Sequence, residues 1–105
     1  MGIAPRVLVE GASSLLSGRK TVTTAGTRVQ LVTAVTPCRG VFIDAEEDNT
    51  GKVVVGDSSV VAALATRTGK TLNADDPVYI EIDDLSKIYL DAVVSTDGVT
   101  YLAVL

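Results

Sequence analysis

The chain has 105 residues, of which 47% are hydrophobic and 21% are charged, and its formal net charge at pH 7 is -4. This length fits one compact domain, and the composition is too apolar for a disordered segment. The chain contains 17 Val and 12 Thr, and such β-branched side chains pack well in pleated strands but lose rotamer freedom in helices. The sequence therefore predicts an all-β domain.

The same counts exclude several kinds of chemistry. Because the chain has no His, Ser-His-Asp and Cys-His catalytic sets and histidine-based metal sites cannot form. The acidic net charge does not provide the basic surface of a nucleic-acid-binding protein. The longest apolar run, Val60 to Ala65, is far shorter than the roughly 20 residues that span a bilayer. We expect no enzyme activity, cofactor, metal, nucleic-acid partner or membrane segment.

The N-terminal part of the chain is the least patterned. Residues 1–18 combine short apolar stretches with small residues, and we expect a flexible arm that pairs at a sheet edge or contacts a neighbouring molecule. Residues 19–105 are expected to form the single domain. Its first strands, over Lys20–Thr24 and Thr27–Ala34, flank a tight connection at Ala25-Gly26.

The middle of the chain contains one clear strand, one apolar strand and one ambiguous stretch. Over Arg39–Ala45, apolar residues on one face alternate with Phe42 and Asp44 on the other. After a polar turn, Lys52–Gly56 carries three consecutive valines, which indicates burial on both faces or at an interface. For Asp57–Thr66 we favour a short strand or an irregular turn over a short helix, because too few apolar residues define a period.

The alternation of apolar and polar residues is strongest in the C-terminal third of the chain. Residues 78–83 and 88–94 each read as half-buried strands, and 99–104 closes the chain as another strand. Between the last two, Ser95-Thr96-Asp97-Gly98 predicts a hairpin, because Asp-Gly suits a turn with positive φ. About eight short strands follow, which predicts a small antiparallel β-sandwich or a jelly-roll-like barrel.

One stretch resembles part of a phosphate-binding loop. Thr68-Gly69-Lys70-Thr71 matches the end of that motif, but Leu64 stands where its first glycine belongs, and no helical pattern follows. We interpret the stretch as a surface turn.

Acidic residues gather at the expected turns. Carboxylates could offer oxygen ligands to a hard cation such as Ca²⁺, but Asn49 stands where an EF-hand loop has its glycine. We interpret these residues as solvated turns that bind their own backbone. They are Asp44, Glu46, Glu47, Asp48, Asp75, Asp76, Asp83 and Asp84.

The single cysteine, Cys38, cannot form an internal disulfide. We expect a small buried side chain at this position. An intermolecular disulfide and a reactive thiol beside Arg39 are the alternatives.

Several short runs of the chain resemble small virion proteins of tailed bacteriophages. The likeness covers about Lys20 to Tyr101, and where related chains tend to have Pro-Gly before the strand at Val78, this chain has Asp75-Asp76-Pro77. That departure changes the turn before this strand and does not alter the strand prediction. The runs that carry the resemblance are Thr21–Thr27, Cys38–Ala45, Asp48–Gly56, Leu72, Asp84–Asp91 and Asp97–Tyr101.

The resemblance implies a β-rich capsid decoration, or cement, protein. Such a protein binds the outer capsid surface as a homotrimer and stabilises the head by bridging major capsid subunits. It would be part of the virion, on the phage head surface, and assembled in the bacterial host cytoplasm. We expect the capsid and protomer contacts to come from the arm and the valine-rich strands, with plain core packing as the alternative for the strands. The residues are Val7, Leu8, Val9, Leu15, Leu16, Val53, Val54, Val55, Val60 and Val61.

Two other functions remain open from the sequence. A phage tail or head-fibre component would present a β-rich domain to the host and would expose aromatic side chains. A small bacterial metal- or carbohydrate-binding module would be stabilised by Ca²⁺ or by glycans.

Overall fold

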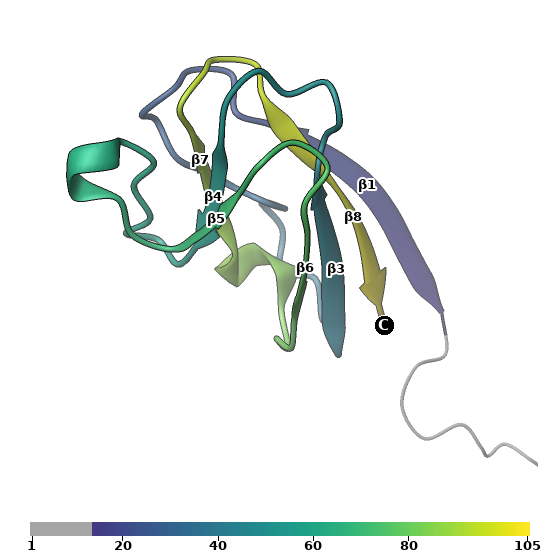
Figure 1. The fold of residues 1–105 in the computed structure, drawn as a ribbon. Coiled ribbons are helices and arrows are strands. Elements are labelled where there is room, and N and C mark those ends of the chain that lie inside the picture. Colours follow the sequence, from purple (N-terminus) through teal and green to yellow (C-terminus); the bar gives the residue numbers. More distant parts are fainter. Residues whose placement is uncertain (1–13) are drawn as a thin grey trace, which may run out of the picture.

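The computed structural model describes residues 14–105 and shows an all-β chain (Figure 1). Eight strands form two antiparallel sheets, called here sheet A, with the order β1-β8-β3-β6, and sheet B, with the order β2-β7-β4-β5. Two short 3-10 helices, η2 (Leu64–Thr66) and η3 (Leu85–Lys87), lie in the connections. The strands are β1 (Leu15–Thr21), β2 (Val29–Gln30), β3 (Gly40–Ala45), β4 (Val53–Gly56), β5 (Lys70–Leu72), β6 (Pro77–Ile80), β7 (Tyr89–Ala92) and β8 (Gly98–Val104).

The main core lies between the two sheets. Val41 and Ile43 of β3 in sheet A are buried in one cluster with Val53 and Leu90 of sheet B. The sheets therefore pack face to face in a sandwich-like arrangement. The predicted all-β domain of about eight short strands is confirmed. Each sheet keeps two open edges within residues 14–105, so this part of the chain does not close into a barrel.

The alternation that predicted a strand over residues 39–45 is confirmed in β3. Val41, Ile43 and Ala45 point into the core, whereas Phe42 and Asp44 are exposed on the opposite face. The strand therefore separates an inner, apolar face from an outer face that carries one large aromatic side chain.

The outer face of sheet B is covered by residues 57–68 of the same chain. Val54 of β4 points to this face and packs with Val60 and Ala62 in a second, smaller buried cluster. The flanking Val53 and Val55 point to the main core. The predicted burial of β4 on both faces is therefore achieved within one chain.

The covering segment has no regular secondary structure over most of its length. It contains a turn, an isolated bridge between Val61 and Thr68, and the 3-10 helix η2. The Asp57 carboxylate accepts hydrogen bonds from the backbone N–H and the hydroxyl of Ser59, at 3.0 and 2.7 Å. The irregular turn that the sequence favours over a helix is what the chain forms here.

Asp91 of β7 is buried, with 2% of its surface exposed. One of its carboxylate oxygens accepts a hydrogen bond from the Gly26 N–H at 3.0 Å, and the other accepts one from the Ala62 N–H at 2.9 Å. Gly26 sits in the predicted tight turn, where the Thr27 N–H donates to the Thr24 carbonyl oxygen. One buried carboxylate thus holds both this turn and the covering segment against sheet B.

The hairpin predicted at residues 95–98 is wrong, because the strands it joins lie in different sheets. The positive φ angle falls at Thr96 (75°), before the Asp-Gly pair. The Asp97 carboxylate accepts hydrogen bonds from the N–H groups of Thr50 and Gly51, at 3.1 and 2.7 Å. Asp97 therefore stabilises the turn after β3, and the 95–98 stretch serves as a crossover between sheets.

Gly98 begins β8 where the backbone of β1 comes very close. A Cβ atom at this position would lie 2.9 Å from the Cα atom of Thr21 and nearer still to the carbonyl oxygen of Lys20. Glycine is therefore required by the close approach of two strands and not by a hairpin turn.

β1 forms an edge of sheet A and pairs with β8 from Leu15↔Val104 to Thr21↔Gly98. The last residues of the expected 1–18 arm therefore belong to the sheet, while residues 1–13 lie outside the described part. β2, at two residues, is much shorter than the strand predicted over 27–34.

Replacing the Asp91 carboxylate is expected to destabilise the protein. Asp91→Ala leaves the buried N–H of Ala62 without an acceptor and removes the acceptor of the part-buried Gly26 N–H, which costs about 2 kcal/mol of unfolding free energy. Urea denaturation followed by circular dichroism measures this change. The control Asp48→Ala removes an exposed carboxylate and should change stability by less than about 0.5 kcal/mol. Equal effects of the two substitutions would contradict the role given to Asp91.

Gly98→Ala is expected to cost about 2 kcal/mol, because the added methyl group meets backbone atoms of β1 that cannot move aside. Gly26→Asn is the control, since nothing lies within 4 Å of its Cβ position and its φ is 86°. Asn tolerates this conformation, so we expect a smaller loss in the same denaturation experiment. A Gly98→Ala protein as stable as the parent would show that the strands do not approach this closely.

Candidate functional site

The outer face of sheet A carries an exposed apolar patch, on the side of the molecule where β1, β8, β3 and β6 lie together in Figure 1. Each of these four adjacent strands contributes one large side chain. Their exposed fractions are 62% for Leu15, 51% for Phe42, 46% for Tyr79 and 39% for Leu102. Single exposed apolar residues are ordinary, whereas a contiguous group marks an interaction site. This apolar patch is the candidate contact surface.

The strand register brings three of these side chains together. Phe42 is the Cα partner of Leu102 on one side and of Tyr79 on the other. The Phe42 and Tyr79 rings are tilted by 46°, with their centroids 4.7 Å apart. A Cβ atom on Gly40 would collide with the Tyr79 ring, so glycine at this position lets the ring lie against the sheet.

A polar row borders the apolar patch. Arg19, Thr100 and Asp44 are successive neighbours across β1, β8 and β3, and all three are exposed. Arg19 also forms an ion pair with Glu46 at 2.7 Å. The surface thus combines an apolar centre with a rim that carries both signs of charge, as protein interfaces do.

An acidic hollow of about 480 Å³ lies beside this rim. Glu47 and Asp48 are exposed to solvent here, and the Arg19 guanidinium supplies the positive charge next to Glu46. Within residues 14–105, no group of three or more Cys, Asp or Glu side chains is placed to hold a metal ion. The residues lining the hollow are Arg19, Asp44, Ala45, Glu46, Glu47, Asp48, Asp75 and Thr100.

The stretch at residues 68–71 lacks the geometry of a phosphate-binding loop. Gly69 has a positive φ of 111°, and the chain then continues as β5, paired with β4, where the phosphate loop would continue as a helix. Without a following helix N-terminus, the stretch does not present the row of N–H groups that binds phosphate.

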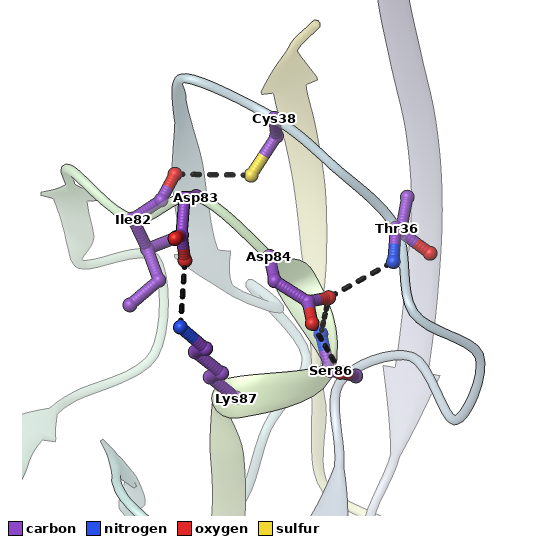
Figure 2. Close-up of polar contacts among 7 residues, drawn as sticks. All are labelled: Thr36, Cys38, Ile82, Asp83, Asp84, Ser86 and Lys87. Atoms are coloured by element: carbon purple, nitrogen blue, oxygen red, sulfur yellow. Dashed lines mark hydrogen bonds and ion pairs between the residues drawn. The ribbon is translucent and has the colours of Figure 1, made fainter.

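Cys38 is half-buried and lies next to the segment that follows β6 (Figure 2). Its Sγ atom donates a hydrogen bond to the Ile82 carbonyl oxygen at 3.2 Å. Burial raises the pKa of the Cys38 thiol above its ordinary value of 9.0, and the negative charges of Asp84 and Asp83 raise it further. These surroundings favour the neutral thiol and disfavour the nucleophilic thiolate.

Asp84 organises the backbone around η3 (Figure 2). Its carboxylate accepts hydrogen bonds from the N–H groups of Thr36 and Ser86, both at 2.9 Å. These contacts, with the Thr36 N–H contributing most, lower the pKa of Asp84 below its ordinary value of 3.8. The carboxylate therefore stabilises the fold above this value, and the contribution is lost as the pH falls through the lowered pKa. The prediction that this Asp binds its own turn is confirmed.

The residues predicted for capsid and protomer contacts lie in four kinds of place. Val7, Leu8 and Val9 fall outside the described residues. Leu15 is exposed in the apolar patch, while Leu16 and Val61 are half-buried. The remaining four are at most 2% exposed and pack within the chain, as core packing would have them; these are Val53, Val54, Val55 and Val60.

Most of the apolar patch was not predicted from the sequence. Phe42 and Tyr79 both fell on the outer face of an alternating strand pattern, which is a detectable signal. The pattern could not show that β3 lies between β6 and β8, and only this pairing brings Phe42 and Tyr79 together with Leu102.

Comparison with known proteins adds no family assignment: no protein-family model matches the chain, and no curated protein matches it. The described part of the chain contains no helix long and apolar enough to cross a membrane.

Alkylation of Cys38 is expected to be slow at pH 7 and to become half-maximal only above pH 9, because its pKa is raised. A Val35→Cys, Cys38→Ser protein is the matched control, since position 35 is 75% exposed and should react as an ordinary thiol. Iodoacetamide labelling across a pH series measures both. Identical profiles for the two thiols would contradict the burial and charge effects described for Cys38.

Proposed function

We propose that this chain is a structural decoration protein of a tailed-phage capsid. It binds the outer surface of the shell and stabilises the head by bridging major capsid subunits. The resemblance over residues 20–101 supports this proposal, and so does the small all-β fold of the described residues. For the fold, we propose a β-sandwich in preference to a jelly-roll-like barrel, because both sheets have open edges.

The observation that carries this function is the position of β1 at an edge of sheet A. Leu15, at the start of the strand, is 62% exposed, so the chain enters the domain at an open, partly apolar sheet edge. An edge strand can pair with a strand of another protein through its backbone. Residues 2–17 are therefore the segment that we assign to the capsid contact.

Binding of many copies explains how modest contacts stabilise a shell. Each copy adds buried area across a joint between two capsid subunits, and the symmetry of the shell repeats that gain at every equivalent joint. A rigid domain suits this task, because little conformational entropy is lost on docking.

The test is co-sedimentation of the full-length chain with empty shells assembled from the major capsid protein of the same phage. We expect saturable binding at many copies per shell and a higher temperature of shell disruption. Leu8→Asp should lose binding by at least tenfold at unchanged domain stability, whereas Val35→Asp, at a position 75% exposed, should bind as the parent does. Absence of binding to intact shells would contradict the decoration function.

The alternative is a tail or head-fibre component that presents a β-rich domain to the host. The exposed Phe42 and Tyr79 pair favours it, because exposed aromatic side chains serve in recognition of protein or sugar ligands. Binding of the purified chain to host cells, together with a low copy number confined to one site of the virion, would support this alternative over decoration.

The number of copies in the free assembly is a separate property. The resemblance to decoration proteins implies three copies, whereas the contact inferred below implies two, and light scattering after size-exclusion chromatography distinguishes the two numbers.

A further inference from the structure

The two sheets differ in how their outer faces are covered. Residues 57–68 of the chain itself bury the outer face of sheet B around Val54. The outer face of sheet A has no such cover among residues 14–105, and there the apolar patch is exposed. We propose that a second copy of this chain covers this face, through a two-fold contact whose axis runs along β8. This inference does not depend on the proposed function.

The register of sheet A makes its outer face self-complementary. β8 lies between β1 and β3, and the residues of the three strands form rows across the sheet. These rows are Leu15–Val104–Gly40, Ser17–Leu102–Phe42 and Arg19–Thr100–Asp44.

A two-fold axis above and along β8 exchanges the positions of β1 and β3 between the two copies. Phe42 of one copy then faces the small Ser17 of the other, and Leu102 faces its own equivalent on the axis. Leu15 faces Gly40, over which the Tyr79 ring lies. Phe42 thus meets a small side chain and Leu15 meets an aromatic ring, while the two Leu102 side chains pack against each other on the axis. This arrangement is compatible with the usual sheet spacing of about 10 Å. The strands of the two copies run in the same direction, as in aligned sheet packing.

The charges at the rim are complementary under the same rotation. Arg19 of one copy faces Asp44 of the other, and the symmetry produces this pair twice. Arg19 already contacts Glu46 at 2.7 Å, and its five N–H donors allow it to bind a second carboxylate. Because each chain carries a net charge of -4, two copies approach with least repulsion through a surface whose centre is uncharged.

The size of the face sets the expected strength. The four strands have seven (β1), seven (β8), six (β3) and four (β6) residues, and at about 4.8 Å between strands and about 3.4 Å per residue they give an area of roughly 400 Å². A stable interface takes about 800 Å² from each partner. We therefore expect a reversible dimer that dissociates on dilution in the micromolar range.

The test is sedimentation equilibrium of the full-length chain between about 1 and 500 µM. We expect the mass of two chains at high concentration and of one chain on dilution. Leu102→Glu places two carboxylates on the axis and should raise the dimer dissociation constant at least tenfold. The control Leu64→Glu, at an exposed position of η2 away from sheet A (81% exposed), should leave it unchanged. Urea denaturation of each variant confirms that the domain is folded.

A charge exchange tests the orientation of the two copies. Arg19→Asp and Asp44→Arg should each weaken the dimer several-fold, and the double variant should recover most of the loss, because the opposite charges still meet. Three outcomes would overturn the proposal: one chain at every concentration, a stable mass of three chains, or a dimer that Leu102→Glu does not weaken. The first would leave residues 1–13 or a capsid subunit as the occupant of the face.

Discussion

The buried carboxylate of Asp91 is the contact on which the exposed surface of this protein depends. By accepting hydrogen bonds from Gly26 and Ala62, it fixes a turn and a long irregular segment over the outer face of sheet B. Neither segment forms a strand that would pair its backbone N–H groups with a neighbouring strand. The Asp91 carboxylate accepts hydrogen bonds from two of these N–H groups instead. Among residues 14–105, one sheet is therefore covered on both faces and the other on one face only.

That asymmetry determines where the protein can bind a partner. The outer face of sheet A is apolar at its centre, and Arg19 and Asp44 lie at its rim. In the proposed assembly, the edge strand β1 carries the capsid contact, and the sheet face meets a second copy. The two contacts share Leu15 and Ser17 of β1, whose backbone lies at the sheet edge and whose side chains lie on the sheet face.

Local patterns were sufficient to predict the strands, but not their neighbours. Two predictions rested on which side chains of a strand point inward: the strand with Phe42 on its outer face, and the burial of β4 on both faces. Both agree with the structure. The Asp97-Gly98 pair led to a wrong hairpin prediction, because both residues contact parts of the chain that are distant in sequence. The Asp97 carboxylate binds Thr50 and Gly51, and Gly98 is required by the close approach of β1. The apolar patch went undetected for the same reason, since it exists only when β3 lies between β6 and β8.

The central claim is that the outer face of sheet A is a contact surface between copies. Nuclear magnetic resonance on a mixture of isotopically labelled and unlabelled full-length protein tests it most directly, because filtered Overhauser spectra detect only contacts between chains. We expect cross-peaks from the Phe42 ring to Ser17 and from Leu102 to its equivalent in the other copy. Intermolecular cross-peaks confined to other surfaces, or none at millimolar concentration, would contradict it.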